Sequence, residues 1–228
     1  MCWLHGKLRP GRFEKASLPL EAMNLKVLYR PETAPPVDHH HQHTMTFHFK
    51  PLNRILEFFY ALHTGVTTNL WLLHHVLGHH KNFLDQTRDQ SAWKRSNGQT
   101  MNVLEYTLTV AGTSYYRGYQ VGKKYPRIQR DFLLYSALTL IGVTVLCWFR
   151  LVPALFIFVL PMIFSMIFTA WVTHDHHSGL DSDDAFHASY NNENRLFNLL
   201  TGNLGYHTAH HYRQGLHWSK LPELHENI

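Results

Sequence analysis

Two long apolar stretches dominate the second half of the chain. Residues Phe132 to Phe149 carry no charge, and after a single Arg150 the stretch from Leu151 to Val172 is again uncharged. A bilayer core of about 30 Å takes about 20 helical residues to cross. The pattern predicts a membrane hairpin at about residues 132–172, with a tight turn near Arg150 and Pro153. Two buried core helices are the alternative, but so small a soluble domain has little protein left to cover both.

A group of basic residues sets the expected orientation of this hairpin. The group precedes the first apolar stretch within one short segment: Arg117, Lys123, Lys124, Arg127 and Arg130. The positive-inside rule places such a segment in the cytoplasm. Because a hairpin returns the tail of the chain to the same side, we expect an integral membrane protein of all-α class whose His-rich helical head is cytoplasmic. The same basic residues are candidates for contacting lipid headgroups or a partner protein.

The first part of the chain is more polar. Residues 52–73 are apolar but interrupted by Arg54, Glu57, His63 and Asn69. This segment is too polar for a lipid-exposed span, so it predicts one or two helices lying at the membrane surface or lining a cavity. Residues 1–42 are rich in Pro and basic residues and predict an irregular arm. We therefore expect a catalytic domain at residues 43–228, and no secretory signal at the start of the chain.

Composition narrows the chemistry. The chain has 20 His but 2 Cys among its 228 residues. Thiolate metal sites and disulfide scaffolds are therefore excluded. The net charge of +5 is modest, and the basic residues are not interleaved with aromatic residues as stacking platforms would be. We expect no nucleic-acid partner.

Two clusters of His have the spacing of metal ligands on helices. If a helix begins at about Tyr206, then His207, His210 and His211 fall at i, i+3 and i+4 and share one face. Neutral imidazoles grouped in this way can hold a transition metal. In the second cluster, His75 and His79 stack at i, i+4, while His80 points away by about a quarter turn. This second arrangement can offer ligands to two neighbouring ions.

Other His residues are less clearly placed. His43 and His48 are five residues apart, about 140° on an ideal helix, so they would not hold one ion from a single face. A solvated His-rich linker is the alternative. Three more His directly follow the second apolar stretch: His174, His176 and His177. The acidic residues among and after them do not match a calcium-binding loop, and we expect them to cap helices or to hold His side chains.

Taken together, these motifs resemble the membrane fatty acid desaturase and hydroxylase superfamily, whose members carry three His boxes with a membrane hairpin before the last. The corresponding boxes here are His43-x4-His48, His75-x3-His79-His80 and His207-x2-His210-His211. The lead-in from Gly205 and the segment from Trp218 to Leu224 also resemble the family. A further family ligand follows the last span, four residues before an Asp, and His177 with Asp181 has that spacing.

The resemblance implies a non-haem di-iron oxidoreductase that uses O2. The implied iron ligands are His43, His48, His75, His79, His80, His177, His207, His210 and His211, with His39, His40 and His41 as alternatives in the first box. Removing hydrogen from an unactivated alkyl carbon requires an oxidant that reduced iron and O2 together supply. The implied substrate is a fatty acyl chain. Electrons would come from a partner such as a ferredoxin or a cytochrome b5-like protein, because no dinucleotide-binding motif is present.

Three other interpretations remain open. The same centre would serve hydroxylation of an alkyl or acyl substrate as well as desaturation. A His-rich zinc-binding membrane protein without redox activity is a second alternative, although residues 132–172 contain no His or Asp within the apolar stretches. Thirdly, relatives usually have a pair of spans ahead of the first box, and residues 1–42 contain nothing of that kind. A reduced, non-catalytic member is therefore also considered.

Overall fold

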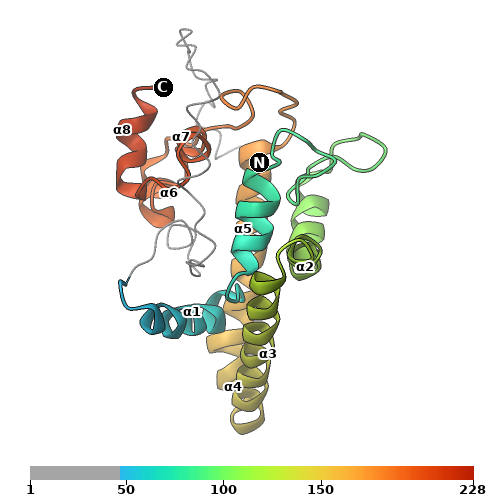
Figure 1. The fold of residues 1–228 in the computed structure, drawn as a ribbon, viewed down its shortest axis with the longest axis vertical. Helices are drawn as coiled ribbons and strands as arrows, with labels where there is room; N and C mark the ends of the chain where they lie inside the picture. Colours follow the sequence, from blue (N-terminus) through green and yellow to red (C-terminus); the bar gives the residue numbers. More distant parts are fainter. Residues whose placement is uncertain (1–46) are drawn as a thin grey trace. The chain divides into compact units, whose positions relative to one another are not determined.

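The computed structural model describes residues 47–228 (Figure 1). His43 and the arm predicted for residues 1–42 lie outside the described residues. Within residues 47–228 the structure contains helices and one isolated bridge, between Lys94 and Thr100, but no strand. This confirms the all-α prediction. The described residues form two compact units, residues 47–175 and residues 176–228, and each is described by itself.

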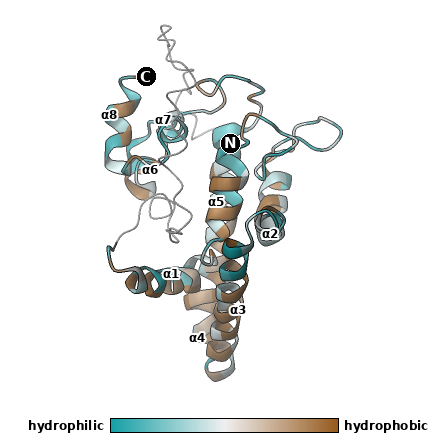
Figure 2. Ribbon diagram, in the orientation of Figure 1, coloured by the Kyte–Doolittle hydropathy of each residue, from teal (hydrophilic) through white to brown (hydrophobic). Residues whose placement is uncertain are grey.

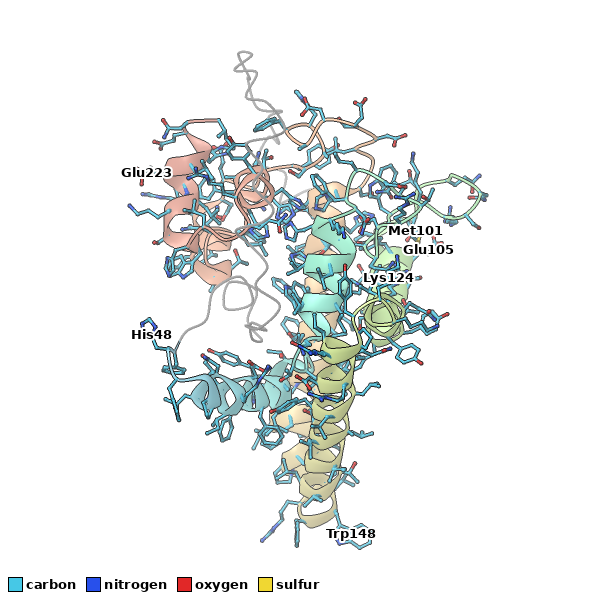
Figure 3. All side chains as sticks on the ribbon, viewed as in Figure 1. His48, Met101, Glu105, Lys124, Trp148 and Glu223 are labelled. Carbon is cyan, nitrogen blue, oxygen red and sulfur yellow. The ribbon has the colours of Figure 1, made fainter. Side chains whose placement is uncertain are left out.

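The first unit contains the predicted hairpin. Helix α3 (Pro126–Phe149) is followed by α4 (Leu151–Ala154), a π-helix η3 (Leu155–Val159) and α5 (Leu160–His177), of which the last two residues belong to the second unit. The mean hydropathies of their most apolar windows are 2.1 and 2.6, and only 11% and 6% of those windows are buried. A core helix of a soluble protein would be mostly buried, so both helices have the length, composition and exposure of membrane spans. Trp148, 87% exposed, projects at the hairpin tip (Figure 3).

Helix α1 (Lys50–Thr64) has its polar side turned inward. Asn53 and Glu57 are buried, whereas Leu52, Ile55 and Phe59 are exposed at helical spacing. Figure 2 shows hydrophobic and hydrophilic residues interspersed along the ribbon of α1. Burial raises the pKa of Glu57, partly offset by the nearby Arg54 guanidinium. An exposed apolar face on a short helix fits the expectation of a helix lying against lipid.

A sharp turn links α1 to the second His box. Gly65 ends α1 with a φ of 69°, and Asn69 also has a positive φ, 64°. The turn is held between α3 and α5: Thr67 Oγ1 and Ser136 Oγ are 2.8 Å apart, and a Cβ on Gly65 would meet the Met162 side chain at 3.2 Å. Close packing at Gly65 explains why this position has no side chain. The turn thereby fixes where the following helix begins.

That following helix is a π-helix, η2 (Leu72–His80), which packs against α2 (Val103–Gly122). Asn102 caps α2, because its side chain accepts a hydrogen bond from the Glu105 backbone N–H at 3.0 Å. The loop between η2 and α2 is anchored on a buried core shared with α5, formed by Trp93, Met101, Tyr106, Val110 and Ala170. The Tyr106 hydroxyl donates to the Ser91 carbonyl oxygen at 2.9 Å within this core. The core therefore joins this loop and α2 to α5, and η2 packs against α2.

The second unit holds the third His box on a short helix. Its elements are α6 (Arg195–Thr201), α7 (His207–Tyr212), a 3-10 turn η4 (Trp218–Lys220) and α8 (Leu221–His225). Asn194 caps α6, and Gly202 ends it with a φ of 62°. Helix α7 packs against α8, the helix of the Trp218–Leu224 segment. The predicted helix start near Tyr206 is confirmed, since α7 begins at His207.

Candidate metal centre

The second His box is arranged differently from the expectation for an α-helix. In η2 the Nε2 atoms of His75 and His80 lie 2.9 Å apart, whereas the rings of His75 and His79 are stacked with centroids at 5.4 Å. A π-helix pairs residues at i and i+5, so His80 returns to the side of His75. The prediction that His80 points away from His75 is therefore wrong. The two residues whose nitrogens meet are the first and last of the box.

His79 is oriented by a carboxylate from the following loop. Its Nδ1 lies 2.9 and 3.0 Å from the two carboxylate oxygens of Asp89, and both side chains are buried. Because a carboxylate only accepts, His79 Nδ1 carries a proton, and in the neutral ring the lone pair is therefore on Nε2. Asp89 is itself fixed by the Ser91 backbone N–H, which donates to it at 2.7 Å. His79 is thus held in the tautomer that ligates a metal through Nε2.

A second group of imidazoles gathers in the unit formed by residues 176–228. The Nε2 atoms of His177, His207 and His211 lie 2.9 to 3.2 Å from one another. His177 Nδ1 donates to the Ala188 carbonyl oxygen at 2.8 Å, so its Nε2 also keeps a lone pair. Burial lowers the pKa of His207 well below its usual range, and the neighbouring His176 adds to that effect. A neutral imidazole is the form that binds metal.

The spacing of these nitrogens fits coordination of one ion. Two imidazoles bonded to the same ion at about 2.1 Å, with an angle of about 90–100° between the bonds, have nitrogens about 3.0–3.2 Å apart. The separations from His211 to His177 and to His207, both 3.2 Å, fall in this range, and those between His177 and His207 and between His75 and His80, both 2.9 Å, lie just below it. Hydrogen bonding alone fits the group of three less well, because a neutral imidazole supplies one N–H and His177 has used its own. The donor set therefore fits a metal.

The remaining predicted ligands are placed as follows. His210 is buried on α7, with its ring centroid 5.6 Å from that of His207 and 5.8 Å from that of His211. The three His of this box thus do not direct their rings to one point. His48 is exposed just before α1 (Figure 3), and no group of metal-ligand type in the described residues includes it. His43 lies outside the described residues, so the first box stays a prediction.

His174 and His176 were considered as alternatives to His177. His174 Nε2 lies 3.2 Å from the Met101 carbonyl oxygen, so this nitrogen donates to backbone. His176 stacks on His207 with centroids 4.0 Å apart and an interplanar angle of 19°. Of the three, His177 is the residue whose Nε2 faces His207 and His211. Asp181, expected to be a neighbour of this ligand, is exposed in the loop after α5.

A network of amides holds the helix of the third box, and sequence reasoning missed it. Asn191 Oδ1 accepts from the Thr208 backbone N–H at 2.9 Å, and its Nδ2 donates to Thr208 Oγ1 at the same distance. Before the helix, a Cβ on Gly205 would lie 2.0 Å from the Asn192 carbonyl oxygen. Only glycine fits there. The available signal was the segment 191–194, in which three of four residues are Asn, because Asn is frequent where side chains replace backbone partners in loops.

Comparison with known proteins identifies the family. A family model described as fatty acid desaturase matches residues 36–228, which is most of the chain. The chain belongs to the fatty acid desaturase family. No curated protein and no solved structure matches it. As in the resemblance drawn from the sequence, the desaturase motifs fall on the His groups of η2 and α7. Family membership and two exposed apolar helices together indicate a membrane protein.

The basic residues near the hairpin divide into two kinds. Arg117 of this desaturase-family chain is turned inward: its Nη1 donates to the Gln90 carbonyl oxygen at 2.5 Å and its Nε to Thr113 Oγ1 at 2.8 Å. It holds the loop that follows the second box. The other four are exposed at the start of α3: Lys123, Lys124, Arg127 and Arg130. Those four have the accessibility that contact with headgroups or with another protein requires.

Proposed function

We propose that this protein catalyses O2-dependent desaturation of a fatty acyl chain at a His-ligated di-iron centre. The observation that carries the proposal is the arrangement of buried imidazoles in each unit. In each unit Nε2 atoms lie at the distance expected for binding one ion, and the Nδ1 atoms of His79 and His177 are held by hydrogen-bond acceptors. Family membership supports a desaturase-like or hydroxylase-like oxidation. Iron, rather than zinc, follows from the need for a redox metal in such a reaction.

The proposed ligands are the His of the three boxes and the His that follows the second span. They are His43, His48, His75, His79, His80, His177, His207, His210 and His211. We propose that these residues bind a pair of iron ions, because nine imidazoles can hold two ions without thiolates. Imidazole suits iron, and a set without thiolate agrees with the near absence of Cys. His39, His40 and His41 are alternative ligands in the first box.

When bound and reduced, the di-iron centre would supply the oxidising power that removes hydrogen from an unactivated carbon. The buried His residues would hold that centre away from bulk water. Asp89 and the Ala188 carbonyl oxygen orient imidazoles, and burial keeps His207 neutral. Because the metal side of each ring is preset, binding needs little reorganisation of these side chains.

The substrate class follows from the membrane setting. An apolar acyl chain is stored in the bilayer, and the exposed surfaces of α1 and of the hairpin are where the protein meets that phase. Removal of two hydrogens gives a double bond. The runner-up is hydroxylation by the same centre, which differs in the position of the acyl chain relative to the irons. We propose desaturation as the reaction and a fatty acyl lipid as the substrate.

Electrons must come from a partner protein. The sequence has no dinucleotide-binding motif of the Gly-x-Gly-x-x-Gly kind. We propose a ferredoxin or a cytochrome b5-like donor acting from the cytoplasmic side. The exposed Lys123, Lys124 and Arg127 carry the positive charge that an acidic donor would meet. Positive charge next to a span also agrees with the cytoplasmic placement of the His boxes.

Metal counting tests the proposal directly. The purified full-length protein should contain close to two irons per chain. Substitution of His79→Ala or His207→Ala should abolish this loading, because each removes a buried ligand. The matched control is His217→Ala, which changes an exposed His paired with Ser219 and should leave the iron content unchanged. Lipid profiling of cells that express the protein with a reductase system should then show new unsaturated acyl chains.

Two outcomes would contradict the proposal. Stoichiometric zinc with no O2 consumption would favour a zinc-binding protein. Unchanged lipids with full iron loading and a competent reductase would favour a non-catalytic member of the family. Hydroxylated acyl chains in place of unsaturated ones would keep the centre and change the reaction to the runner-up.

A further inference from the structure

A small cavity lies between η2, α2 and α5, entirely within the unit formed by residues 47–175. It has a volume of about 30 Å³, and its lining includes His74, His75, Ala111, Ser114, Met166 and Ala170. The space exists because α2 and α5 face each other here through small side chains. One lining residue is His75, a proposed iron ligand, whose ring stacks on Trp71 with centroids 4.5 Å apart. Another is Met166, which lies within the second apolar helix.

The side chains that line the cavity offer fewer free polar groups than their residue types suggest. The hydroxyl of Ser114 donates to the Ala111 carbonyl oxygen at 3.0 Å, and that of Thr173 donates to the Thr169 carbonyl oxygen at 2.9 Å. Both hydroxyls are therefore engaged with their own helices. His74 is buried and its Nε2 has no hydrogen-bond partner. That nitrogen can bond to one water, but a stable buried water makes about two to four hydrogen bonds, more than this single atom supplies, so the lining favours a small apolar occupant.

The volume limits what that occupant can be. One water molecule requires a cavity of roughly 10–15 Å³, so this cavity holds about two molecules of that size. Sites for larger ligands measure roughly 300–1,000 Å³, so an acyl chain does not fit without rearrangement. A diatomic, apolar molecule fits both the volume and the lining.

We propose that this cavity is a binding site for dioxygen on its way from the lipid phase to the metal centre. The inference rests on the proposed function, which requires O2. Dioxygen dissolves better in hydrocarbon than in water, so a cavity bordered by a membrane helix receives it from the bilayer. His75 lines the cavity, and bound gas is thereby held next to a proposed ligand of the centre. Recognition is by shape and apolar contact, with no covalent step.

Xenon is the probe for the cavity, because it is apolar, of similar size and visible to diffraction and to 129Xe NMR. The purified full-length protein, in detergent and with its metal, should bind xenon between α2 and α5. Ala111→Leu and Ala170→Leu each place a larger side chain in the cavity and should abolish this signal. Ala137→Leu is the matched control, since Ala137 is exposed on α3. It should bind xenon as the wild type does.

Steady-state kinetics provides a second readout. Filling the cavity should raise the KM for O2 severalfold while kcat at saturating O2, the KM for the acyl substrate and the iron content stay as in the wild type. Ala170 is buried, so a Leu at that position could clash with its neighbours and destabilise the fold. Ala111 is only half-buried, so Ala111→Leu is the better tolerated variant.

Each possible result either supports or overturns the inference. Absence of xenon from the cavity of folded wild-type protein would overturn the inference. An increase in the KM for the acyl substrate, with the KM for O2 unchanged, would also overturn it and assign the space to the acyl chain. If the wild type shows no O2-dependent oxidation, the proposed function fails; xenon in the cavity would still support a site for a small apolar gas.

Discussion

Individual hydrogen bonds set which nitrogen of each ligand is available to a metal. His79 and His177 both donate Nδ1–H to an oxygen, the one to the Asp89 carboxylate and the other to the Ala188 carbonyl. Each partner lies about ten residues along the chain from its His, so it is brought back by a loop. The charge of Asp89 also raises the basicity of the His79 ring. Asp89 is therefore a positioning residue, because it acts through His79.

Replacing Asp89 should weaken metal binding. We expect Asp89→Ala to lower the affinity for ferrous iron by roughly 10–100-fold, because His79 loses the acceptor that fixes its tautomer. Competition with a chromogenic chelator measures the affinity, and circular dichroism checks that the helices remain. Asp85→Ala is the control, since Asp85 is only half-buried and its carboxylate accepts from Thr87 rather than from a His. Equal affinities for the two variants would contradict the role given to Asp89.

At the scale of whole helices, the positions of η2 and α7 depend on helix type, on side-chain hydrogen bonds and on a glycine without a side chain. The π-helical geometry of η2 brings His75 and His80 together across five residues, which an α-helix does not do. Helix α7 is short, and its start depends on the amide bonds from Asn191 and on the close approach of Gly205 to the Asn192 carbonyl oxygen. Short helices are marginal by themselves, so tertiary contacts decide whether α7 forms.

Gly205→Ala should therefore disrupt α7. A Cβ at 2.0 Å from a backbone oxygen cannot be accommodated by rotating a side chain, so the chain must shift. We expect destabilisation of about 1–3 kcal/mol or more, seen as a lower melting temperature in detergent and as loss of iron. Gly112→Ala is the matched control: Gly112 lies in α2 with nothing near its missing Cβ, and Ala there should be neutral or stabilise by up to about 1 kcal/mol. Similar melting temperatures for both variants would be evidence against a tight approach at Gly205.

At the scale of the whole molecule, the two apolar helices determine how the chain meets the membrane. Both expose nearly all of their most apolar windows, and the turn at Arg150 is the only break between them. A hairpin of this kind places the residues before α3 and those after α5 on one side of the bilayer. The di-iron proposal requires that topology, because its ligands lie on both sides of the hairpin in sequence.

Cysteine labelling in sealed vesicles tests this topology. In a background without Cys2 and Cys147, an impermeant maleimide should label Arg150→Cys from the side opposite to the one that labels Asn97→Cys and Ser219→Cys. Asn97 and Ser219 are both exposed, and they lie before and after the hairpin. Labelling of Asn97→Cys and Ser219→Cys from opposite sides would rule out a hairpin that crosses twice and, with it, a shared metal centre.

The sequence alone was sufficient to predict the helices that have a clear pattern of apolar residues or of His spacing. The apolar stretches predicted the position of the hairpin. Helix α3 begins at Pro126, six residues before the apolar run, because a helix continues through polar residues until a capping position ends it. The spacing from His207 to His211 located α7, and the three boxes led to the family that the comparison then identified. These features depend on composition and local periodicity, which the sequence states directly.

Other features of the site were decided only in three dimensions. The pairing of His75 with His80 depends on a π-helix, whose stability comes from packing against α2 and which an ordinary helical period does not predict. Asp89 and the Ala188 carbonyl oxygen became partners because loops fold back onto the His, and the inward turn of Glu57 depends on Arg54 and Thr68. The sequence by itself determined the kinds of ligands and the helices that carry them. Tertiary structure decided which lone pairs converge, because that depends on contacts between residues distant in the chain.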